Sequence, residues 1–131
     1  MMSYNKRLIM SITLVAGFMQ TVIAHAAPPA SAETEVNFLL GYVEKSGCEF
    51  YRNGTWHDSA SARAHLHDKY EYLLAGNQIH AAEDFIDKAA TKSSFSGQPY
   101  QVKCAGSTAV TSRHWLHDEL ARFRAHQKTR F

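Results

Sequence analysis

Six polar side chains, spread along the chain, could together bind an anion. They are two cations, a histidine, two serines and a tyrosine: Arg52, His65, Lys69, Ser94, Ser96 and Tyr100. Guanidinium, ammonium and hydroxyl groups that converge on one polar cleft would suit a carboxylate or a phosphate. The alternative is that the cations pair with nearby acids and the serines bond to the backbone of their own loop. Because serine-rich loops mostly serve their own turns, the sequence by itself favours this alternative.

The histidines offer a weaker case for metal chemistry. His65 and His67 would point to different faces of a helix, whereas His114 and His117 could share a face. A zinc site needs a third protein ligand, and no HExxH pattern supplies one. No G-x-S-x-G or S-x-x-K pattern marks a nucleophilic serine, while a catalytic carboxylate pair has no local signature. We therefore predict no metal, no cofactor and no catalytic residue, and keep an enzyme as an alternative.

The first 26 residues have the pattern of a secretory signal peptide. Met1–Arg7 is a short basic leader, Leu8–Ile23 is a mostly apolar run, and Ala24-His25-Ala26 is a small-x-small cleavage site. The apolar run is too short and too polar for a stable membrane span. We therefore expect cleavage after Ala26 and export, with no transmembrane anchor left on the mature chain. A later cut after Ala32, at Ala30-Ser31-Ala32, is the alternative, but it lies further from the apolar run.

Removing this signal changes the charge of the protein. The whole chain has a formal net charge of +2, but Lys6 and Arg7 belong to the signal. The mature chain of 105 residues then has 12 basic and 12 acidic side chains. This balance excludes the basic footprint of a nucleic-acid-binding or membrane-surface protein. Seven histidines also remain, for which ordinary surface positions are the simplest interpretation and a pH-sensing role is the alternative.

Cys48 and Cys104 are the only cysteines of the chain. Export would place them in an oxidising compartment, where two cysteines allow one intramolecular pairing. Closing the long loop between them would stabilise a small domain by about 4 kcal/mol in the chain-entropy model. A reactive thiol or a metal pair would need a low-pKa setting or further ligands at close spacing. Neither cysteine has such neighbours, so we predict a structural disulfide.

One small α+β domain is expected to carry these residues. The predicted segments are a signal peptide over 1–26, a flexible leader over 27–32, the domain over 33–126 and a tail over 127–131. Apolar residues at helical spacing, together with capping residues, predict helices over 33–45, 58–75, 79–92 and from 111 onward.

A small antiparallel sheet completes the predicted domain. A hairpin is expected around Asn53-Gly54, a dipeptide that accepts the backbone angles of tight turns, and a further strand over 100–104. The predicted order is α-β-β-α-α-β-α, with about four helices packed on a sheet made of the hairpin plus one strand. The expected core positions of the helices are Val36, Leu39, Leu40, Val43, Ala62, Leu66, Tyr70, Leu73, Ile79, Ala82, Phe85, Ile86, Ala89, Trp115, Leu116, Leu120 and Phe123.

Several spaced motifs resemble the YfeK-like family of small exported bacterial proteins. They are Arg52-Asn53-Gly54, His65-Leu66-x-x-Lys69, Ala82-Glu83-x-Phe85-Ile86-Asp87, Ser94-x-Ser96-Gly97-x-Pro99-Tyr100 and Trp115-Leu116. The resemblance extends from about Thr34 to Arg124. It implies an exported, periplasmic domain of unknown function, with no established reaction to carry over. Because some relatives lack the cysteine pair, it also implies that a disulfide reinforces the fold rather than determining it.

The run Ser96-Gly97-Gln98-Pro99-Tyr100 also fits the S-G-x-x-Y loop of bacterial C-type lysozyme inhibitors. Those inhibitors are all-β proteins whose loop serine and tyrosine enter the active cleft of the target enzyme. We expect a non-enzymatic binding module of the periplasm, whose partner is an envelope protein or a small anionic ligand and not nucleic acid. An inhibitor of a cell-wall hydrolase is the alternative function, and an envelope enzyme is the third.

Overall fold

The computed structural model describes Gly17 and residues 30–130. The predicted signal peptide, apart from Gly17, and residues 27–29 of the predicted leader therefore lie outside the described residues. None of the described helices combines the length and the apolarity that a membrane crossing needs.

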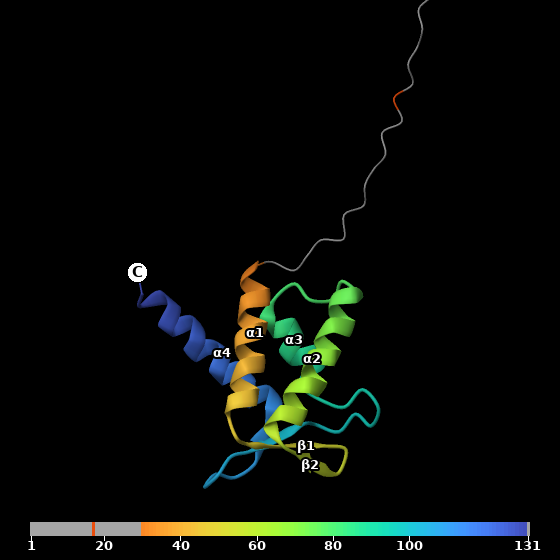
Figure 1. Ribbon diagram of the computed structural model, residues 1–131, viewed down its shortest axis with the longest axis vertical. Helices are drawn as coiled ribbons and strands as arrows, with labels where there is room; N and C mark the ends of the chain where they lie inside the picture. The colour runs from red at the N-terminus through yellow and green to blue at the C-terminus, as the bar shows by residue number, and fades with distance from the viewer. Residues whose placement is uncertain (1–16, 18–29, 131) are drawn as a thin grey trace, which may run out of the picture.

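The described chain forms four helices and a four-stranded sheet, which confirms the predicted α+β class. The elements are α1 (Ala30–Lys45), β1 (Glu49–Arg52), β2 (Thr55–His57), α2 (Ser59–Ala75), α3 (Ala82–Ala89), β3 (Gln101–Lys103), β4 (Val110–Thr111) and α4 (Ser112–Lys128). Figure 1 shows the helices on one side of the sheet, with the C-terminal end of α4 projecting to the side. The sheet thus leaves its other face without a covering helix.

The strands run antiparallel in the order β2-β1-β3-β4. Phe50 of β1 is opposite Val102 of β3, and both are buried against the helices. The predicted hairpin and the further strand are present, and β4 adds a fourth strand that the prediction did not include, whose Val110 pairs with Val102. A strand of only two residues has no alternating pattern to reveal it, and it forms here because β3 offers it a free edge.

The hairpin between β1 and β2 turns at the predicted dipeptide. Asn53 has φ 50° and Gly54 has φ 85°. Positive φ at both central positions is what a two-residue hairpin turn requires, and asparagine and glycine adopt it at least cost. The turn sets the register in which Arg52 pairs with Thr55.

Helix ends differ from the prediction where local hydrogen bonds decide them. The α3 helix begins at Ala82 and not at residue 79, because the Asp84 Oδ2 atom accepts hydrogen bonds from the backbone N–H groups of His80 and Ala81. It ends at Ala89 and not at residue 92. Beyond that end, the Thr91 hydroxyl donates to the carbonyl of Ile86 at 2.8 Å and satisfies a group the helix leaves open.

The outer helices are longer than predicted. The α1 helix begins at Ala30 and Ala32 is buried, so residues 30–32 of the predicted leader belong to the domain. The α4 helix continues to Lys128 and includes two residues of the predicted tail. The predicted caps of α2 and α4 are correct, since Asp58 Oδ1 accepts from Ser61 N at 2.8 Å and Thr111 Oγ1 from His114 N at 3.3 Å.

The core lies between the helices and the inner face of the sheet. The predicted positions of α1, α2 and α3 are all buried, and Ile79 is buried just before α3. On α4, Leu116 and Leu120 are buried, whereas the prediction that Trp115 and Phe123 lie fully inside was wrong. Both rings are half-buried at the edge, where Trp115 stacks on Tyr42 at 4.5 Å between ring centroids and Phe123 on Phe38 at 4.1 Å.

A disulfide joins the predicted cysteine pair. Cys48 and Cys104 are bonded at an S–S distance of 2.01 Å. Cys48 precedes β1 and Cys104 follows β3, so the bond connects the ends of two paired strands. It lies beside the core and away from the polar loop of residues 93–99.

Candidate functional site

The polar residues singled out by type and spacing gather around one shallow pocket. Arg52 ends β1, His65 and Lys69 are one turn apart on α2, and Tyr100 precedes β3. The pocket has a volume of about 290 Å³ and is lined by Arg52, Asn53, His65, Lys69, Ser93, Ser94, Phe95 and Tyr100. We call it the cationic pocket. Ser96 lies outside the lining, and its hydroxyl bonds to Asn53 Oδ1 at 2.5 Å.

A chain of hydrogen bonds connects the functional groups of this pocket. Arg52 Nη1 is 2.7 Å from His65 Nδ1, and His65 Nε2 is 3.2 Å from the Tyr100 hydroxyl. A guanidinium group can only donate, so Nδ1 must be the accepting nitrogen of a neutral ring. The ring proton is then on Nε2, and His65 donates it to Tyr100.

The Tyr100 hydroxyl accepts a second hydrogen bond from Lys69. The Lys69 Nζ atom is 3.2 Å from the hydroxyl oxygen and 5.0 Å from the centre of the Tyr100 ring. With two bonds accepted, both lone pairs of the hydroxyl oxygen are occupied. Its own proton is used by no group among the described residues, so the hydroxyl remains free to donate to a ligand.

The surroundings keep His65 uncharged. Partial burial, followed by the charges of Arg52 and Lys69, lowers the pKa of His65 to about 4. Burial and Arg52 also lower the pKa of Lys69, and burial raises the pKa of Tyr100. At neutral pH the pocket therefore contains two cations, a neutral imidazole and a protonated phenol.

Among the described residues, Arg52 and Lys69 form no ion pair with a carboxylate. Within the part of the chain that the structure describes, Arg52 bonds to His65, and Lys69 bonds to Tyr100 and to the carbonyl of Lys92 at 3.2 Å. The alternative in which Arg52 and Lys69 pair with nearby acids is therefore wrong. The local sequence could not predict these partners, because they depend on which side chains the packing of α2 against the sheet brings near Arg52 and Lys69.

The serine loop partly serves its own turn, as the alternative expected. The buried hydroxyl of Ser93 accepts hydrogen bonds from the backbone N–H groups of Phe95 and Ser96, at 3.1 and 3.2 Å. Ser96 accepts another from Gln98 N at 3.2 Å. Of the two predicted serines, Ser94 lines the cationic pocket and Ser96 supports its rim.

Sequence reasoning missed Asn53, Ser93 and Phe95 as pocket residues. Phe95 is 95% exposed at the tip of the serine loop, which is unusual for so large an apolar side chain. A phenylalanine inside a Ser/Gly loop was a usable signal. The sequence predicts Asn53 only as a residue of the hairpin turn, and this turn also places it in the wall of the cationic pocket.

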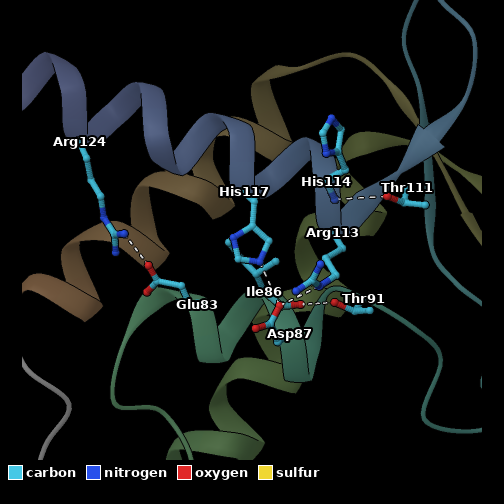
Figure 2. Close-up of polar contacts among 9 residues, drawn as sticks. All are labelled: Glu83, Ile86, Asp87, Thr91, Thr111, Arg113, His114, His117 and Arg124. Atoms are coloured by element: carbon cyan, nitrogen blue, oxygen red, sulfur yellow. Dashed lines mark hydrogen bonds and ion pairs between the residues drawn. The ribbon is translucent and has the colours of Figure 1, made fainter.

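A second polar cluster joins α3 to α4 and is shown in Figure 2. The Asp87 Oδ1 atom accepts from Arg113 Nε at 3.1 Å and contacts His117 Nε2 at 3.0 Å, while Glu83 bonds to Arg124 at 2.5 Å. Charges of both signs compensate one another here, which is typical of a structural ion-pair network. Across residue 17 and residues 30–130, no group of three or more His, Cys, Asp or Glu side chains has a metal-binding arrangement.

The fold and the pocket together define a small disulfide-bonded α+β domain with a cationic pocket. Residues 30–124 match the family of unknown function DUF5329, and the chain belongs to that family. It is 36% identical over 90 residues to the "Uncharacterized protein YfeK" of Salmonella typhimurium, a match that covers 68% of this chain and 73% of the relative. No solved structure matches the chain.

Proposed function

We propose that the protein is a binding module of the bacterial periplasm that holds a small anion in the cationic pocket. The observation that carries the proposal is the pair of half-buried cations, Arg52 and Lys69, with no carboxylate partner among the described residues. A partly desolvated charge without a counter-ion is costly, and an anion would remove that cost. The free proton of Tyr100 adds a third donor, and donors alone suit a carboxylate or a phosphate.

Binding is favoured over acid–base catalysis by the state of His65. Both of its ring nitrogens are engaged, with Arg52 and with Tyr100. A general acid or base must be within reach of the proton that it transfers and must be free to exchange it. A ring held from both sides instead orients Arg52 and Tyr100 toward a ligand.

The inhibitor alternative is disfavoured by the position of Tyr100. Its side chain is only 7% exposed and its hydroxyl bonds to His65 and Lys69. It therefore cannot enter the active cleft of another enzyme without unfolding the site. We expect lysozyme turnover on peptidoglycan to be unchanged by micromolar excess of the purified protein. Inhibition of lysozyme would favour the inhibitor alternative over the proposed function.

The proposal is tested by titrating the purified protein with acetate and with inorganic phosphate at pH 7, followed by calorimetry or amide NMR shifts. We expect saturable binding of at least one anion and a loss of at least tenfold in affinity in Lys69→Met and in Arg52→Met. Lys128→Met removes an exposed lysine at the far end of α4 and should bind as the wild type does. Absence of binding to both anions, or equal affinity in Lys69→Met, would reject the function.

A further inference from the structure

An apolar cavity adjoins the cationic pocket. It lies between the β1–β2 hairpin and the first half of α2 and has a volume of about 30 Å³. Its apolar lining includes Phe50, Ala62 and Leu66, all of which belong to the buried core. Arg52, His65 and Tyr100 line this cavity and the cationic pocket as well, so the two spaces meet along their hydrogen-bond chain.

The size and lining of this cavity suit a short hydrocarbon group. A single water molecule needs about 10–15 Å³ of such volume together with several polar partners. The volume here is sufficient, but Phe50, Ala62 and Leu66 offer a water no hydrogen bonds. The polar side chains of the lining present almost no polar surface to this space, so it favours an apolar group over water. The volume limits the occupant to a few carbon atoms.

We infer that the ligand is a small amphiphilic anion, with its anionic group against Arg52 and Lys69 and a short hydrocarbon chain in the apolar cavity. The inference rests on the proposed function and names the class of ligand. The charged group lies on the side of Lys69 and Ser94. Because both spaces open to the surface, the hydrocarbon crosses the outer side of the hydrogen-bonded Arg52–His65 pair to reach Ala62. Neither space alone supplies both contacts, and the residues shared between them set their separation.

This geometry predicts a dependence of affinity on chain length. Each methylene that is buried should raise affinity about fourfold. The gain should continue over about two or three carbons and then stop, because the cavity has no room for more. A flat cationic surface would bind all carboxylates of equal charge alike.

The test compares acetate, propionate, butyrate and hexanoate as ligands of the purified protein at pH 7, with methyl and propyl phosphate as the matching phosphate pair. We expect butyrate to bind at least tenfold tighter than acetate, with no further gain for hexanoate, or the equivalent preference for propyl phosphate. Equal affinities within each series would overturn the inference and leave the proposed function intact. Absence of binding throughout both series would overturn both.

A cavity-filling variant gives an independent result. Ala62→Val occupies the apolar cavity, whereas Ala60→Val makes the same change at an exposed position of the same helix. We expect the first variant to bind acetate as the wild type does and to lose the preference for butyrate, and the second to keep both. A full butyrate preference in folded Ala62→Val would overturn the inference. If circular dichroism shows that this variant is unfolded, the chain-length series of the wild type decides.

Discussion

His65 is the residue that connects the two cations of the site to the rest of the fold. It accepts from Arg52 and donates to Tyr100, which in turn accepts from Lys69. A protonated ring would lose the bond from Arg52 and would add a third positive charge to the cluster. The neutral state of His65 is therefore part of the folded structure, and it makes stability depend on pH.

The first prediction concerns this dependence. The pKa of His65 is about 4 in the folded protein and 6.5 for a free histidine side chain, so between these pH values the unfolded chain binds the proton more strongly. Stability should then fall as pH decreases from about 6.5 to about 4, by about 2 kcal/mol after allowance for solvent screening. Urea unfolding at a series of pH values measures the effect.

His65→Gln is the control for this prediction. Glutamine can still accept and donate hydrogen bonds but does not titrate. The slope of stability against pH in this window should be smaller in the variant than in the wild type. The pKa values of other groups, such as Asp58 and Asp84, are also lowered. Their contribution to stability is lost mainly below pH 4, and it is lost equally in the wild type and in His65→Gln. Identical slopes would show that His65 has an ordinary pKa.

At the scale of elements, one arginine holds three helices together. Arg124 of α4 bonds to Glu35 of α1 through Nε at 2.6 Å and Nη2 at 2.9 Å, and to Glu83 of α3 through Nη1 at 2.5 Å. Its hydrogen bond lowers the pKa of Glu83. The C-terminal end of α4 projects away from the other helices (Figure 1).

The second prediction compares two arginines of α4. Arg124→Met should reduce the free energy of unfolding by about 1–2 kcal/mol, since it breaks several charged hydrogen bonds to partly buried carboxylates. Arg113→Met removes an exposed pair with Asp87, visible in the same close-up (Figure 2), and should cost less than about 1 kcal/mol. Urea unfolding measures both. A larger effect for Arg113 would contradict the assignment of Arg124 as the structural connection.

At the scale of the whole molecule, the disulfide closes a long loop of a small domain. Cys48 and Cys104 are separated by 56 residues. The third prediction is that replacing both cysteines by alanine lowers the unfolding free energy by up to about 4 kcal/mol while the domain still folds. Cys48 is one of the buried core residues, but the other core side chains are left in place by this change. Circular dichroism and urea unfolding test this. A variant that is unfolded without denaturant would show that the bond determines the fold.

The fourth prediction concerns export. The mature protein recovered from a periplasmic extract should begin at Ala27, and its intact mass should rise by two hydrogens on reduction. N-terminal sequencing and mass spectrometry measure both. A full-length chain that stays in the cell would reject the prediction of export. Two freely alkylated thiols in the exported protein would reject the disulfide. The result also decides whether the net charge of zero applies to the working protein.

Local signals determined the elements, because helices and tight turns depend on neighbouring residues. The stripe Ala62, Leu66, Tyr70 and Leu73 of α2, the Asn53-Gly54 turn and the Asp58 cap could all be predicted. Residue types and spacing also predicted part of the lining of the cationic pocket, namely Arg52, His65, Lys69, Ser94 and Tyr100. They were insufficient for β4, whose two residues form a strand only because β3 is beside them, and for the ends of α3, which side chains of the next turn decide.

Only the tertiary structure decided how the site works, because its properties depend on residues far apart in the chain. The bond of His65 to Tyr100 spans 35 positions. The hydrogen-bond partners of Arg52 and Lys69, which among the described residues include no carboxylate, depend on the packing of α2 against the sheet. The apolar cavity next to them likewise exists only between two packed elements. The sequence by itself determined which groups the protein carries and where the chain bends. The charge state of His65, the free proton of Tyr100 and the apolar cavity beside them depend on burial and on distances between residues far apart in the chain. No local sequence pattern specifies these quantities.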